Sequence, residues 1–104
     1  MTFWNLSNLQ LEQFKPGILS KAEIGENLIM VCMEIESEKE DTGHQHEYDQ
    51  CGLVLDGKIE MFIGEERKVL LSNESYFIPS AVRHGWKTFE KPVKLLDVSL
   101  KSPK

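Results

Sequence analysis

Cysteine is scarce in this sequence, and apolar runs long enough to cross a membrane are missing. The two cysteines, Cys32 and Cys51, each lie inside an apolar stretch, and two cysteines at this separation form neither a zinc cluster nor a disulfide framework. We therefore expect both to be buried free thiols. A membrane-spanning helix needs about 20 apolar residues, and the N-terminus lacks the basic start, apolar core and cleavage site of a signal peptide. A cytoplasmic protein without membrane contact is expected.

Positive charge is also limited, with 12 lysines and arginines against 17 aspartates and glutamates and a net charge of −5. Nucleic-acid binding depends on clustered cations that neutralise phosphates, and the cationic residues here form no stripe along the sequence. Nucleic acid is therefore not an expected partner.

The chain has 104 residues, of which 40% are hydrophobic and 28% charged. This composition is typical of one soluble domain, which we assign to residues 1–104. A chain of this size removes roughly 60 to 70% of its unfolded surface from water on folding, enough for stability without disulfides or a structural metal. A metal bound here would therefore serve function.

Short strand-like segments separated by turn signals run through the chain. Residues 27–36, 75–80 and 93–100 are rich in apolar and β-branched residues, and residues 51–64 predict two strands joined by a hairpin turn at Asp56-Gly57. The charged, turn-prone residues 37–43 predict a solvated loop. Because no amphipathic helix is visible, the sequence predicts an all-β sandwich or barrel.

The first 27 residues begin with a segment that is too apolar to be a free tail. We predict that they pack on the barrel or on a partner subunit. A monomer this small would struggle to cover such a segment, so a homodimer is expected. The apolar side chains concerned are Phe3, Trp4, Leu6, Leu9 and Leu11.

Three polar residues between positions 44 and 50 share one parity. In a β-strand, side chains alternate between faces, so His44, His46 and Gln50 can lie on the same face of an extended strand. This spacing is poor for a helix, where residues i and i+2 diverge. The pattern predicts a strand bent around one metal ion, with Cys51 pointing away from it.

Together with a downstream segment, these residues carry a resemblance to the cupin family. Cupins have a first motif G-x5-H-x-H-x3,4-E-x6-G and a second motif G-x5-P-x-G-x2-H-x3-N. This sequence has His44-x-His46-x3-Gln50-x6-Gly57 and then Pro79-x4-His84, so that all its histidines occupy the motif's histidine positions. The second motif departs at Asn73 and Ala81, which replace glycines, and at Thr88, which replaces asparagine.

The resemblance implies a small single-domain cupin with a double-stranded β-helix, or jelly-roll barrel. It also implies one divalent transition metal ion held by His44, His46, Gln50 and His84. Imidazole suits zinc, nickel, iron, manganese and copper, so the ligands do not select the ion. Gln50 is neutral where the family carries a carboxylate, which leaves the ion its full charge and favours redox-neutral chemistry over oxygen activation.

The last predicted strand carries a carboxylate among apolar residues. Alternation places Leu95, Asp97 and Ser99 on one face, and a carboxylate there is costly unless it faces a cavity or hydrogen-bond donors. Asp97 either transfers protons in the site or points outward to a cation. The order of the histidines, Gln50, Pro79 and the "LLDV" segment also resembles the small cupins of pectin degradation, which open unsaturated uronates, and this implies the catalytic role for Asp97.

Other residues are candidates for the wall of the pocket, namely Tyr48, Trp86 and Ser99, and Arg83 either anchors a substrate carboxylate or is an ordinary loop arginine. We interpret the protein as a redox-neutral lyase or isomerase acting on a small sugar acid or carbonyl compound. Two alternatives stay open. One is a non-catalytic module that binds or senses a small molecule, and the other is a cupin dioxygenase, because one fold can host all three.

Overall fold

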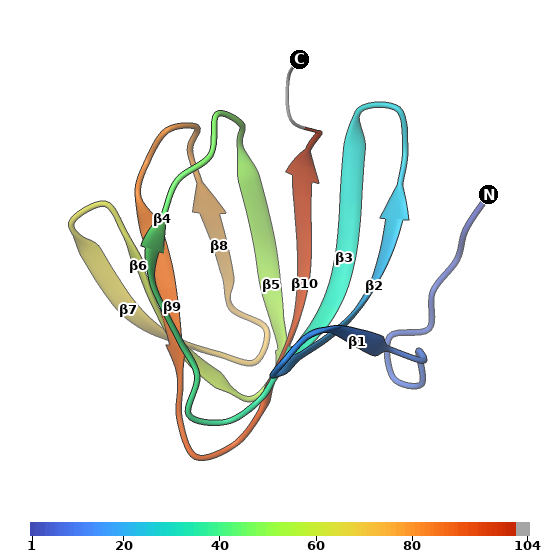
Figure 1. Cartoon of the computed structure of the whole chain (residues 1–104), viewed down its shortest axis with the longest axis horizontal. Helices are drawn as coiled ribbons and strands as arrows, with labels where there is room; N and C mark the ends of the chain where they lie inside the picture. The colour runs from blue at the N-terminus through green and yellow to red at the C-terminus, as the bar shows by residue number, and fades with distance from the viewer. Residues whose placement is uncertain (102–104) are drawn as a thin grey trace.

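The computed structural model describes residues 1–101, and all their regular structure is β (Figure 1). Two antiparallel sheets face each other, a six-stranded sheet in the order β1-β2-β3-β10-β5-β8 and a four-stranded sheet in the order β4-β9-β6-β7. The predicted all-β jelly-roll fold is confirmed. Within residues 1–101 there is no helix that could cross a bilayer. The strands are β1 (Glu12–Lys15), β2 (Ile18–Ile24), β3 (Leu28–Ile35), β4 (Glu40–His44), β5 (Gln50–Asp56), β6 (Lys58–Ile63), β7 (Glu66–Leu71), β8 (Ser75–Ile78), β9 (His84–Thr88) and β10 (Val93–Leu100).

The core lies between the two sheets and follows the alternation of their strands. In β10, Val93, Leu95 and Asp97 are buried while the residues between them are only half-buried. The four-stranded sheet contributes apolar side chains such as Ile59 and Leu70 to the same core. Each fully buried aliphatic side chain contributes roughly 1.5–3 kcal/mol through its transfer from water. Apolar contacts in this core thus hold the two sheets together. Its buried apolar members are Ile35, Val54, Ile59, Met61, Leu70, Tyr76, Ile78, Val93 and Leu95.

The predicted hairpin at Asp56-Gly57 is wrong, because the chain crosses from one sheet to the other at this point. β5 belongs to the six-stranded sheet, whereas β6 pairs with β7 and β9 in the four-stranded sheet. Gly57 has a φ of 101°, and a Cβ atom there would lie 2.8 Å from the carbonyl oxygen of Pro92. Glycine therefore allows a sharp corner. The hairpin of this region instead joins β6 to β7, with Gly64 at a φ of 61°.

The predicted loop over residues 37–43 is also partly wrong, because β4 begins within it. Its residues pair with β9, with Glu40 opposite Lys87 and His44 opposite His84. β4 is an edge strand, so one side of its backbone faces solvent and tolerates charged residues. This location explains why a charged sequence forms a strand.

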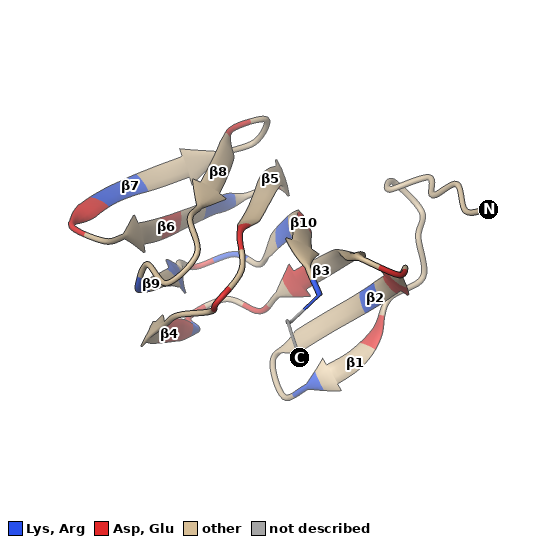
Figure 2. Cartoon of the chain, turned by 90° about the horizontal axis from the view of Figure 1, so that it is seen from above, with Lys and Arg blue, Asp and Glu red and all other residues tan. Residues whose placement is uncertain are grey.

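The N-terminal region forms a wing beside the barrel. Seen from above, β1 and β2 extend past the four-stranded sheet (Figure 2). Residues 1–11 form no strand, and their apolar side chains divide, since Phe3 is 94% exposed while Leu6 is half-buried. Lys94 Nζ donates a hydrogen bond to the carbonyl oxygen of Leu6 at 2.5 Å. This segment therefore contacts its own barrel in part, and contact with a partner subunit stays a prediction.

Candidate metal centre

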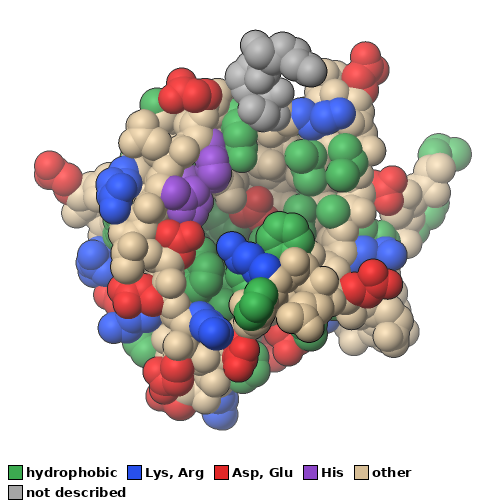
Figure 3. Space-filling model, in the orientation of Figure 1, with side chains coloured by type: hydrophobic (Ala, Val, Ile, Leu, Met, Phe, Trp, Pro, Cys, Tyr) green, Lys and Arg blue, Asp and Glu red, His purple; other side chains and the backbone are tan. Residues whose placement is uncertain are grey.

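Three histidines gather at one end of the space between the sheets. His44 ends β4, His46 follows in the connection to β5, and His84 begins β9 opposite His44. Their nitrogen atoms that could bind a metal all lie within 4.8 Å of one another. Figure 3 shows histidines beside a hollow in which hydrophobic side chains are visible, with acidic and basic side chains at its edge. The predicted single strand through these residues is wrong, because the strand stops at His44 and Gln50 opens β5 in the other sheet.

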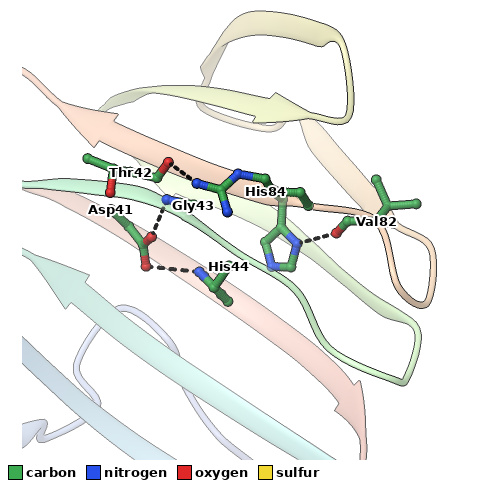
Figure 4. Close-up of polar contacts among 7 residues, drawn as sticks. Asp41, Thr42, Gly43, His44, Val82 and His84 are labelled. Carbon is green, nitrogen blue, oxygen red and sulfur yellow. Dashed lines mark hydrogen bonds and ion pairs between the residues drawn. The ribbon is translucent and has the colours of Figure 1, made fainter.

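Hydrogen bonds set the orientation of two of the imidazoles (Figure 4). His84 Nδ1 lies 2.9 Å from the carbonyl oxygen of Val82, which only accepts, so Nδ1 carries the proton and donates. His44 Nδ1 lies 3.0 Å from Asp41 Oδ2. In both rings the other nitrogen, Nε2, is then free to offer its lone pair, the arrangement in which histidines bind metals.

Asp41 is held in place by its own neighbours. The Gly43 amide donates to Asp41 Oδ1 at 2.9 Å. Burial raises the pKa of Asp41, but the hydrogen bond from Gly43 and the contact with His44 outweigh it and hold the pKa below its usual range. Asp41 thus stays a carboxylate that orients His44. Sequence reasoning missed Asp41, although its position three residues before His44 was a usable signal.

Arg83 contacts the backbone of residues 42–43 from outside the cavity. Its guanidinium donates to the carbonyl oxygen of Thr42 at 3.1 Å. Gly43 has a φ of 138°, and a Cβ atom there would lie 2.4 Å from an Arg83 nitrogen. The arginine therefore packs against the glycine backbone, and it is absent from the described residues that line the cavity. Its contacts support the backbone before His44.

His46 is enclosed by aromatic rings. The ring of Tyr48 stacks on it with a centroid separation of 4.7 Å and an interplanar angle of 4°. Burial, followed by the neighbouring His44 and His84, lowers the pKa of His46. The neutral imidazole required for metal binding is therefore favoured. Ala81, which has a φ of 68°, donates its amide proton to the carbonyl oxygen of His46.

The amide nitrogen of Gln50 is hydrogen-bonded, whereas its amide oxygen has no hydrogen-bond partner among the described residues. Nε2 donates to Asp97 at 3.2 Å from Oδ1 and 3.0 Å from Oδ2. Among the described residues, no hydrogen-bond partner exists for two buried atoms, Gln50 Oε1 and His84 Nε2. Buried polar atoms are rarely left unpaired. Two unpaired acceptors in the cavity of the three imidazoles fit a site for a metal cation.

Asp97 lies in the same cavity, as the alternation of β10 predicts. Tyr76 Oη donates to Asp97 Oδ2 at 2.6 Å. Burial raises the pKa of Asp97, and the hydrogen bonds from Tyr76 and Gln50 oppose this only in part. Burial and then the carboxylate raise the pKa of Tyr76, so the phenol keeps its proton and donates. Asp97 does not point outward, so that alternative is excluded.

Sequence reasoning missed Tyr76 and the glycine that makes room for it. A Cβ atom on Gly52 would lie 2.2 Å from Tyr76 Oη, so only glycine leaves space for the hydroxyl group. A buried tyrosine in a strand looks like ordinary core, since its contact with Asp97 depends on the pairing of β5 with β8 and β10.

The cavity has a volume of about 450 Å³. Cys51 lies outside it and is only half-buried, so the prediction that both thiols are buried is wrong for this residue and holds for Cys32. The predicted site residues that line the cavity are His44, His46, Tyr48, Gln50, His84, Trp86, Asp97 and Ser99.

Comparison with known proteins identifies the family to which this fold belongs. The family model described as "Cupin domain" matches residues 31–99. The chain belongs to the cupin family. No curated protein matches its sequence.

Solved structures share the fold of this cupin over all or nearly all of its length. KdgF from Halomonas sp. superposes with a TM-score of 0.85 at 24% identity, covering 100% of this chain and 96% of that one. An RmlC-like cupin from Shewanella frigidimarina gives 0.84 at 21%, with 100% and 94% covered. The polyketide cyclase RemF from Streptomyces resistomycificus gives 0.79 at 19%, with 96% and 79% covered. At these identities the likeness establishes the fold.

Proposed function

We propose that this cupin is a metal-dependent enzyme that catalyses a redox-neutral reaction of the lyase or isomerase type on a small carbonyl compound or sugar acid. His44, His46, His84 and Gln50 would hold one divalent transition metal ion. The observation that carries the proposal is a pair of buried acceptors in the cavity of the imidazole cluster, Gln50 Oε1 and His84 Nε2, which have no hydrogen-bond partner within residues 1–101.

The neutral charge of Gln50 supports a redox-neutral reaction. A bound divalent ion would polarise a substrate oxygen, and it would do so more strongly with no anionic ligand to offset its charge. A ligand set without an anion also disfavours oxidation of iron(II), which argues against a dioxygenase. The carboxylate of Asp97 is hydrogen-bonded to the amide nitrogen of Gln50.

Asp97 is proposed to move the substrate proton. Its carboxylate accepts two contacts from Gln50 and one from Tyr76. A carboxylate offers about four lone-pair sites, so one acceptor position remains. Tyr76 and Gln50 fix its orientation, and fixed orientation is what makes a general base effective.

Two measurements test the proposal. Elemental analysis of the purified protein should find one divalent metal per chain, which a His46→Ala variant should lack. The loaded protein should then be offered unsaturated uronates, keto acids and diketones, with ultraviolet absorbance and oxygen concentration followed together.

A change in absorbance without oxygen uptake supports the proposal. Oxygen uptake coupled to turnover would favour the dioxygenase instead. Saturable binding without any turnover across the panel would favour a binding or sensing module. RemF, a polyketide cyclase by name, and the resemblance to uronate cupins are the reasons for including both carbonyl compounds and uronates.

A further inference from the structure

The cavity next to the histidines has two chemically different halves. Residues of β4, the connection from β4 to β5, β5, β9 and β10 supply the imidazoles, the amide and the carboxylate. The neighbouring wall, on β2 and β3 of the same sheet as β10, is apolar over most of its length. Its cavity-lining apolar side chains are Ile18, Ala22, Ile29, Val31 and Met33.

Strand register brings these halves into direct contact. Asp97 of β10 lies opposite Val31 of β3, which in turn lies opposite Ala22 of β2. Neighbouring strands are about 4.8 Å apart. A molecule that reaches Asp97 therefore has the apolar side chain of Val31 directly beside it.

The four-stranded sheet contributes apolar surface to the same space. Trp86 lies two residues after His84 on β9, and Met61 lies opposite it on β6. Both side chains line the cavity, and Trp86 is half-buried. An aromatic ring in this position can stack on a flat apolar group whose oxygen atoms are at the histidines.

Hydrogen-bonding groups are few on the apolar wall. Among the described lining residues of β1 to β3, only Ser20 and Lys15 are polar, and Lys15 is exposed. A sugar acid carries a hydroxyl on nearly every carbon. Each hydroxyl that loses water without gaining a partner weakens binding. The wall therefore disfavours a polyhydroxylated body.

We infer that the β2–β3 wall is a binding subsite for the apolar body of the ligand, so that the substrate is a carbonyl compound with an aromatic or aliphatic body and not a sugar acid. This inference narrows the proposed function and rests on it for the placement of the carbonyl group. A small molecule is the expected occupant because the wall is continuous with the histidine end in one cavity of about 450 Å³, a usual size for a small-ligand site.

Calorimetric titration of the zinc-loaded protein with two probes tests the inference. Benzoylacetone offers two oxygens and a phenyl ring, and D-galacturonate offers oxygens on a hydroxylated ring. We expect benzoylacetone to bind at least about tenfold more tightly, because only its ring gains from the apolar wall. Equal or tighter binding of galacturonate would overturn the inference.

Val31→Thr replaces one methyl group of the wall by a hydroxyl group at nearly constant size. The Val31→Thr variant should bind benzoylacetone severalfold more weakly than the wild type and should bind galacturonate with unchanged affinity. Val69→Thr makes the same chemical change on the exposed part of β7 and should leave both unchanged. Ala22→Asp, at an exposed position on the rim, should weaken benzoylacetone further and serves if Val31→Thr folds poorly. Unaltered benzoylacetone binding in both wall variants would contradict the subsite.

A measurement without metal separates this inference from the proposed function. Anilinonaphthalene sulfonate should bind the metal-free protein with enhanced fluorescence, should be displaced by benzoylacetone, and should bind less to Val31→Thr than to Val69→Thr. This result would support the apolar subsite even if the protein took up no metal. Dye binding that neither benzoylacetone nor Val31→Thr reduces would overturn the inference even if the metal site proved active.

Discussion

Gln50 and Asp97 are joined by two hydrogen bonds, with Nε2 of the amide 3.0 Å and 3.2 Å from the two carboxylate oxygens. The contact fixes the amide, since only its nitrogen can donate to a carboxylate. Oε1 is therefore the atom left for another partner. The family motif places a carboxylate at position 50. This chain has a neutral amide there, and the amide is hydrogen-bonded to the carboxylate of Asp97.

Replacing Asp97 by Asn should stop turnover while the metal content stays intact. Asparagine keeps the shape of the side chain but cannot accept the substrate proton, and loss of a general base costs about 10²- to 10⁴-fold in rate. Steady-state kinetics and elemental analysis on the same preparation provide the measurement. Asp56→Asn, at an exposed position at the end of β5, is the matched control. A fully active Asp97→Asn enzyme would place the base elsewhere.

Gln50→Glu should retain or tighten metal binding but slow the reaction. The added negative charge strengthens the attraction for a cation and reduces the polarisation of a substrate oxygen. It also brings a second carboxylate against Asp97, so the metal-free variant should melt at a lower temperature than the wild type. Metal titration, kinetics and thermal melts check the three effects. A faster Gln50→Glu enzyme would contradict the role given to the neutral amide.

His46→Ala should remove most of the metal and leave the fold. The two sheets are held by buried apolar side chains such as Ile35 and Val54, which do not depend on an ion. Circular dichroism should show the same β-sheet spectrum for this variant and for wild-type protein treated with a chelator. Unfolding on chelation would mean that the metal is structural.

Gly52→Ala should destabilise the protein by about 1–3 kcal/mol, because the new methyl group overlaps the Tyr76 hydroxyl and forces the core to shift. Gly25→Ala is a suitable control, since its nearest neighbour is a carbonyl oxygen at 3.5 Å. Urea unfolding of both variants gives the difference. Equal stability would show that Tyr76 can move away from Asp97 at no cost.

We expect a homodimer in solution. Several large apolar side chains of the N-terminal wing are exposed, among them Phe3, Phe14 and Ile24, and burying them against a second copy would remove them from water. Sedimentation velocity at micromolar concentration measures the state, and a variant without the first twelve residues tests the contribution of the N-terminus. A monomer in both cases would refute this expectation.

The match to the family motif grouped His44, His46 and His84, and the structure brings these three histidines together. The strand expected to carry the first two ends at His44, and metal binding stays a prediction. Alternation along β10 correctly placed Asp97 and Ser99 on the face that lines the cavity.

Prediction failed where the outcome depended on the pairing of distant segments. The dipeptide Asp56-Gly57 marks a sharp turn, but a turn signal does not say whether the next strand pairs with the one before it. Tyr76 reaches Asp97 across 21 positions of sequence, and no local pattern records such a contact. Cys51 was expected to be buried because it lies in an apolar stretch, yet it is only half-buried at its place on β5.

The candidate ligands come from both sheets, with His44 and His84 on the four-stranded sheet and Gln50 on the six-stranded sheet. An ion that all of them held would tie the two layers together at one end of the barrel, in addition to the apolar core that packs between them. Metal affinity would then report on the spacing between the layers. Pressure, temperature or a bulky molecule bound in the cavity would change that spacing. Each would therefore change the metal affinity without altering any of the metal-binding side chains.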